Sequence, residues 1–219
     1  MVDAVKVFFL VLSALFPIVD PLGGSPIFLL LTKGHSSETR RALSWRIALN
    51  SFLLMVGCYF IGSHVLDFFG VSLPVVQVAG GLVVVSVAWR MLAEKEEVRA
   101  LARKDIQSDE VFRRAFYPLT LPLTVGPGSI SVAITLGANS ARHYGIHVIV
   151  GLGALAAIAV VAVTVFLSYA FAARLARVLG EVGTTVLLRL SSFLLLCIGV
   201  QIVWNGLSVL LSSVQPRLQ

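Results

Sequence analysis

Residues 17–28 read PIVDPLGGSPIF and lie in the middle of an apolar run that extends from about residue 5 to residue 31. A run of that length can cross a bilayer as a helix, which needs about 20 residues. Its prolines lack a backbone N–H donor, and its glycines adopt conformations that other residues avoid. The stretch therefore predicts a membrane helix that unwinds from Pro17 to Ser25 and resumes with Ser25 as N-cap and Pro26 as the first helical residue.

A second apolar run, about residues 115–139, contains a similar interruption, with PLTLPLTVGPGSI at residues 118–130. We expect Pro122 to end a first half-helix, Gly-Pro-Gly at 126–128 to form the break, and Pro127 or Ser129 to begin the next half. Unwound backbone is tolerated in hydrocarbon only where protein or a water-filled cavity receives it. The two breaks are therefore expected to face each other inside a helix bundle.

The composition of the whole chain indicates a membrane protein. Of its 219 residues, 58% are hydrophobic and 13% are charged, whereas roughly a quarter of the residues of a soluble domain are charged. Six apolar runs are long and continuous and do not alternate, which favours helices over a barrel. We therefore expect an all-α membrane protein with one domain (1–219) and six transmembrane helices, the first and fourth discontinuous, at about 5–31, 45–66, 72–92, 115–139, 146–170 and 187–212.

The positions of the two breaks divide the chain into similar halves. The first repeat covers about residues 1–92, a polar loop about 93–114, and the second repeat about 115–219. Because each half has three spans, an odd number, the second half is expected to lie inverted relative to the first, as in many secondary transporters.

The distribution of lysine and arginine predicts the orientation. Fourteen of the 17 lie at the first, third and fifth connections, and three lie on the other side. By the positive-inside rule both termini face outward and the loop at 93–114 is cytoplasmic, in the cytoplasmic (inner) membrane of a bacterium or archaeon. The net charge of +6 does not indicate a nucleic-acid partner, because the basic residues flank apolar runs.

Asp20 lies within the first break, where an ionisable side chain costs about 2.5–3.5 kcal/mol and usually marks a functional site. It could accept the ammonium of a zwitterionic substrate or take up a coupling proton, and the alternative is that it only caps a half-helix. Two helix N-termini also converge at the breaks and suit a small anion such as a carboxylate. The candidate substrate-binding residues are Asp20, Pro21, Gly23, Gly24, Ser25, Pro26, Thr124, Gly126, Pro127, Gly128 and Ser129.

Further candidates line the predicted spans. Amide side chains there could contact substrate or form interhelical hydrogen bonds, and the paired glycines could let the third span approach the breaks. These residues are Asn50, Gln77, Gly80, Gly81 and Gln201. We expect no catalytic residues, metal site or cofactor, because the chain has no nucleophile elbow, phosphate-binding loop or zinc signature.

Three stretches resemble the MarC family, also called the six-span neutral amino-acid transporter family and related to LysE-type exporters. They are FPIVDPLGGSPIF at 16–28, AGGL at 79–82 and PLTVGPGSI at 122–130. Gly24 and Ser129 stand where members often carry Asn and Ala. The resemblance covers essentially the whole chain and implies an integral membrane permease, with some members moving glycine, alanine or similar amino acids. It also implies a historical link to multiple antibiotic resistance.

These features together predict a secondary transporter of small neutral amino acids or related zwitterions that works by alternating access. A proton or Na⁺ gradient would drive it, because no nucleotide-binding motif is present. The alternatives are an exporter of other small metabolites or drugs, a channel, and a non-transporting membrane partner protein.

Overall fold

The computed structural model describes residues 2–32, 34–93, 115–144 and 148–214. Every regular element in these ranges is helical, which confirms the predicted all-α class. The helices, in chain order, are α1 (Val2–Val19), α2 (Pro21–Leu31), α3 (Ser37–Phe68), α4 (Leu73–Ala93), η3 (Phe116–Thr124), α6 (Pro127–Tyr144), α7 (Val148–Ala170) and α8 (Ala172–Val214).

Five helical stretches in the described residues are long and apolar enough to span a membrane: Val2–Leu31, Ser37–Phe68, Leu73–Leu92, Val148–Ala170 and Val182–Ser212. Large apolar side chains are exposed on all of them, as lipid contact requires. The run predicted at 115–139 is not among the five, because η3 and α6 are separated at Val125, whose backbone is extended (φ −114°, ψ 92°). The structure therefore confirms a multi-pass helical protein, whereas the count of six spans stays a prediction.

The helices pack in a regular pattern. Helix α4 lies along α8, α3 packs against both α6 and α7, α1 packs against α7, and α2 packs against α7 and α8. Helix α1 buries a stripe at every fourth position, Val7, Val11, Leu15 and Val19, in the hydrophobic core. This spacing is the helical period and directs one face of α1 toward the bundle.

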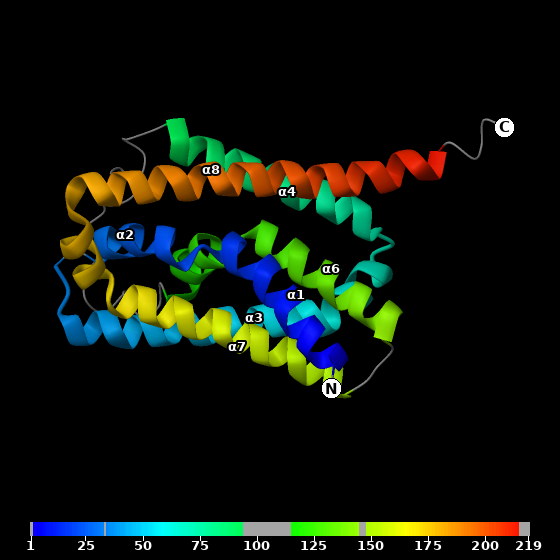
Figure 1. Ribbon diagram of the computed structural model, residues 1–219, viewed down its shortest axis with the longest axis horizontal. Helices are drawn as coiled ribbons and strands as arrows, with labels where there is room; N and C mark the ends of the chain where they lie inside the picture. Colours follow the sequence, from blue (N-terminus) through cyan, green and yellow to red (C-terminus); the bar gives the residue numbers. More distant parts are fainter. Residues whose placement is uncertain (1, 33, 94–114, 145–147, 215–219) are drawn as a thin grey trace.

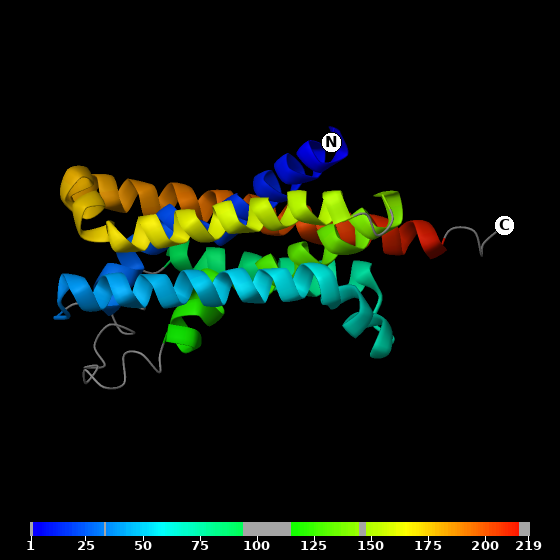
Figure 2. The ribbon, with the colours of Figure 1, turned by 90° about the horizontal axis from the view of Figure 1, so that it is seen from below.

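Figures 1 and 2 show that α1 begins and α8 ends at the same end of the bundle, whereas the α2–α3 and α7–α8 connections lie at the opposite end. Helix α8 is bent at Gly180, which adopts φ 66° and ψ −175°. A positive φ is accessible there because glycine has no Cβ. The predicted cytoplasmic loop lies outside the described residues from 94 to 114.

Candidate functional site

The first helix break is one residue wide. Asp20 separates α1 from α2 and adopts the left-handed conformation (φ 43°, ψ 63°), the one positive φ of a non-glycine residue in the described chain. Aspartate tolerates this conformation better than most residues because its short side chain can bond locally. Its Oδ1 accepts a hydrogen bond from the Gly23 amide at 3.0 Å, so Asp20 is the N-cap of α2 and Pro21 is its first residue.

The predicted unwinding from Pro17 to Ser25, with Ser25 as N-cap, is therefore wrong. Helix α2 continues through Pro26, whose missing N–H leaves the Leu22 carbonyl without its usual helical donor. The Ser25 hydroxyl replaces that donor and bonds the Leu22 carbonyl at 2.8 Å. This local compensation lets the helix accept an internal proline and moves the break to Asp20.

The second break is longer and begins earlier than predicted. Within η3, Tyr117 (φ −124°, ψ 125°) and Leu121 (φ −109°, ψ 126°) are extended. Each precedes a proline, and proline pushes the preceding residue out of the helical region. The segment does not end at Pro122 but at Thr124, and α6 begins at Pro127, one of the two predicted starts.

Threonine hydroxyls satisfy carbonyls in this irregular segment. Thr120 Oγ1 donates to the Ala115 carbonyl at 2.7 Å, and Thr124 Oγ1 donates to the Leu119 carbonyl at 2.8 Å. Both threonines are buried. Their bonds pair the carbonyls of Ala115 and Leu119 inside the bundle, where an unpaired polar group is costly.

Tyr169, near the end of α7, connects the two breaks. Its ring stacks on Phe28 of α2, with ring centroids 4.7 Å apart and planes 10° apart. Its hydroxyl lies 3.0 Å from Thr124 Oγ1, and a methyl group at Gly24 would lie 2.6 Å from the same hydroxyl. The first turn of α2 and the end of η3 thus meet on one fully buried tyrosine.

The Asp20 carboxylate faces α8 as well as its own helix. The Ser191 hydroxyl of α8 donates to Asp20 Oδ1 at 3.4 Å, and a methyl group at Gly23 would lie 2.8 Å from Ser191 Cβ. The Asp20 carboxylate therefore lies at the N-terminus of α2, where the helix dipole favours a negative charge.

The start of α6 is packed between α4 and α1. A methyl group at Gly80 of α4 would lie 2.6 Å from Ser131 Cβ and 3.4 Å from the Pro127 carbonyl oxygen. A methyl group at Gly128 would overlap Val84 of α4 and would lie 3.8 Å from Ile18 of α1. Glycine at 80 and 128 thus lets the second break approach α4 and the last turn before Asp20.

We call the cluster of Asp20, Gly24, Thr124, Tyr169 and Ser191 the junction. Some of the other predicted site residues lie near this junction, and others lie elsewhere on the helices. Ser129 is buried and donates to the Gly126 carbonyl at 3.1 Å. Gln77 donates to Thr135 of α6 at 3.4 Å, and Gly81 packs against Val203 of α8. Asn50 is half-buried on α3. Gln201 is exposed on α8 and bonds Asn205 of the same helix at 2.9 Å, so it lies on the outer surface.

Sequence reasoning missed both Tyr169 and Ser191 as site residues. The available signal for Tyr169 was a single phenol at the end of the very apolar run 146–170, where a buried hydroxyl needs a partner. Its partner, Thr124, is 45 residues away in the chain.

Comparison with known proteins gives the family. The model of MarC family integral membrane proteins matches residues 5–211. The chain belongs to the MarC family. A membrane protein of Archaeoglobus fulgidus is 33% identical over 206 residues, which cover 94% of each chain. The inner membrane proteins MarC of Salmonella typhimurium and Escherichia coli O1:K1 are 32% identical over 213 and 214 residues, covering 94% of this chain and 96% of the relatives. No solved structure matches the chain.

The MarC match includes every residue of the junction: Asp20, Gly24, Thr124, Tyr169 and Ser191 all lie between residues 5 and 211. The junction therefore lies within the MarC-matched region and does not belong to an added segment. The names of the MarC relatives place those relatives in a membrane, and the bacterial ones in the inner membrane.

Proposed function

We propose that this MarC protein is a secondary transporter of small neutral amino acids, such as glycine or alanine, or of related zwitterions. Transport proceeds by alternating access between two inverted halves of three spans each. The observation that carries the proposal is the meeting of two interrupted helices on Tyr169, with the Asp20 carboxylate at the first turn of α2. Transporter binding sites are commonly built from such broken helices.

The charges around the junction fit a zwitterion. Among the described residues, the salt bridge found is between Lys6 and Asp3. No described lysine or arginine therefore forms a salt bridge with Asp20. A substrate ammonium, a proton or Na⁺ would offset the cost of this carboxylate. The substrate carboxylate would lie at the start of α6, where a helix N-terminus presents N–H groups and a partial positive charge.

The packing supports two inverted halves. The contact of α2 with α7 corresponds to the contact of α6 with α3, and the contact of α4 with α6 corresponds to that of α8 with α2. Helices α4 and α8 pack against each other, as do α3 and α7, and each of these pairs joins an element to its counterpart in the other half. A pseudo-twofold axis between inverted repeats would produce this pattern.

The proposed orientation places both termini outside the cytoplasm. Arg41, Arg174 and Arg177 are exposed at or near the α2–α3 and α7–α8 connections. These connections lie opposite the end where α1 begins and α8 ends (Figures 1 and 2). The positive-inside rule makes the arginine-bearing end cytoplasmic.

The test is counterflow in proteoliposomes with a panel of labelled amino acids. The proposal predicts saturable, pH- or Na⁺-dependent exchange of glycine or alanine. Flux that does not saturate would indicate a channel, and exchange only of other solutes would indicate an exporter of other metabolites or drugs. The absence of any flux in correctly inserted protein would favour a non-transporting partner and would contradict the proposal.

A further inference from the structure

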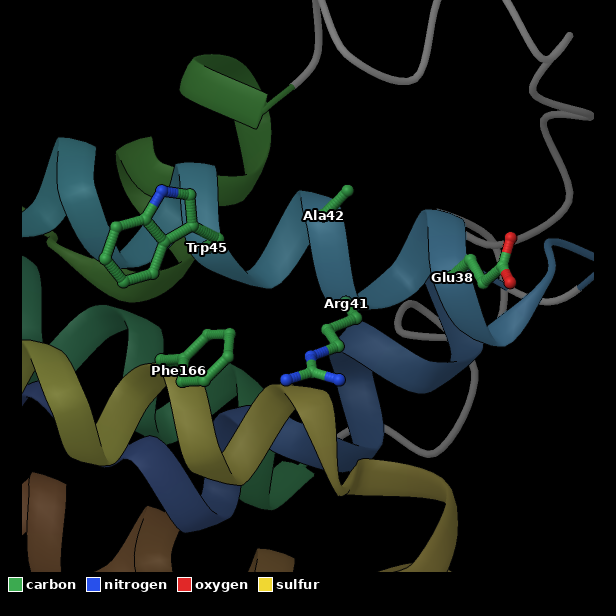
Figure 3. Close-up of a pocket in the computed structure, with 5 residues that line it drawn as sticks. All are labelled: Glu38, Arg41, Ala42, Trp45 and Phe166. Carbon is green, nitrogen blue, oxygen red and sulfur yellow. The ribbon is translucent and has the colours of Figure 1, made fainter.

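A groove lies on the outer face of the molecule between α3 and α7. Its volume is about 480 Å³. Figure 3 shows its lining residues, which are Glu38, Arg41, Ala42 and Trp45 of α3 and Phe166 of α7. The groove is near the α2–α3 connection, at the end of the bundle that the proposed orientation makes cytoplasmic. None of its lining residues belongs to the junction around Asp20.

The end of the groove away from Glu38 is aromatic. Trp45 and Phe166 form an edge-to-face pair with ring centroids 5.8 Å apart and planes 90° apart. Trp45 remains 59% exposed in this arrangement. An exposed tryptophan at the start of an apolar span suits the boundary between headgroups and acyl chains.

The end of the groove nearer the α2–α3 connection carries two opposite charges. Glu38 and Arg41 are three residues apart on α3, a spacing that permits an ion pair. No ion pair forms between them in the described structure. Figure 3 shows the Arg41 guanidinium directed toward Phe166 and the Glu38 carboxylate at the far end of the groove, so each charge is available to a ligand.

The order of these side chains along α3 matches the order of groups in a phospholipid. A helix rises about 1.5 Å per residue, so Arg41 lies about 4.5 Å deeper than Glu38, and Trp45 about 6 Å deeper than Arg41. We propose that the groove binds a phospholipid whose headgroup carries a primary ammonium, as in phosphatidylethanolamine. The ammonium bonds Glu38, the phosphate bonds Arg41, and an acyl chain lies across Trp45 and Phe166.

The lipid preference of the purified full-length protein tests this assignment. Native mass spectrometry would titrate phosphatidylethanolamine, its fully N-methylated analogue phosphatidylcholine, and the anionic phosphatidylglycerol, all with the same acyl chains. We expect the first to bind about tenfold more tightly than the other two. Equal binding of all three lipids, or tighter binding of phosphatidylglycerol, would overturn the assignment, and this readout requires no variant.

Variants at Glu38 and Arg41 test which group of the lipid each side chain binds. Arg41→Gln should weaken phosphatidylethanolamine binding about tenfold, and Glu38→Gln should abolish the preference over phosphatidylglycerol. Arg40→Gln is the matched control, because it removes the same charge one residue away without lining the groove. Equal losses in Arg40→Gln and Arg41→Gln would show a general charge effect and would refute the site.

Discussion

Replacement of Tyr169 by phenylalanine tests whether the contact between the two breaks matters for function. The Tyr169 hydroxyl lies 3.0 Å from Thr124 Oγ1, and Thr124 Oγ1 already donates to the Leu119 carbonyl. The tyrosine is therefore the donor. Its removal leaves no unpaired donor behind and keeps the ring stacked on Phe28.

The expected energy change is small and can be bounded. One buried hydroxyl hydrogen bond contributes about 0.6 kcal/mol between membrane helices and about 1 kcal/mol in proteins generally. A change of 1.4 kcal/mol corresponds to a factor of ten, so Tyr169→Phe should shift the population of the assembled junction by about three- to fivefold. The half-saturating amino-acid concentration should rise by up to that factor, because the competent state is less populated.

Tyr59→Phe provides the matched control. The Tyr59 hydroxyl donates to Ser140 Oγ at 2.8 Å, which makes an equivalent bond between α3 and α6 that does not involve either break. Both variants should lower the thermal unfolding temperature similarly, whereas only Tyr169→Phe should change half-saturation in counterflow. If the two variants have the same transport kinetics, the inferred role of the junction is refuted.

Two further pairs of variants test the packing and the first break. Gly137→Ala places a methyl group against a backbone carbonyl of α3 and should destabilise the protein by about 1–3 kcal/mol, whereas Gly57→Ala enters open space and should stabilise it by about 0.5–1 kcal/mol. Comparable unfolding temperatures for the two would contradict the α3–α6 contact. Ser25→Ala should cost about 1 kcal/mol, because its hydroxyl replaces the donor missing at Pro26, whereas Ser13→Ala, which removes a hydroxyl bond in an uninterrupted turn, should cost almost nothing. An equal effect in thermal unfolding would show that the Ser25 bond does not compensate for the proline.

The sequence correctly predicted that the helical runs at 5–31 and 115–139 are interrupted, because proline and glycine within an apolar run disfavour a continuous helix. It placed the first N-cap five residues too late. Pro21 and Pro26 are both acceptable first residues of a helix, and the choice depends on whether the Leu22 carbonyl finds another donor. Local composition does not show that Ser25 will supply it.

The irregular backbone of η3 also has a local cause in the sequence, although the break was predicted only at 126–128. Tyr117 and Leu121 are extended because a proline follows each of them. The contacts of Tyr169 were not predictable in this way, because they depend on how α7 packs against α2 and η3. Tertiary packing of this kind leaves no periodic signal in a single sequence.

The proposed transport function requires Asp20, at the junction of two broken helices, to bind the charged substrate or the coupling ion. Counterflow of labelled alanine through Asp20→Asn and Asp67→Asn proteoliposomes tests it, because asparagine keeps the cap on Gly23 and removes only the charge. Asp67 is exposed at the end of α3 and serves as the control. We predict about a tenfold loss for Asp20→Asn, equivalent to one charge-assisted bond, and normal exchange for Asp67→Asn. Wild-type exchange by Asp20→Asn at every pH would contradict the claim.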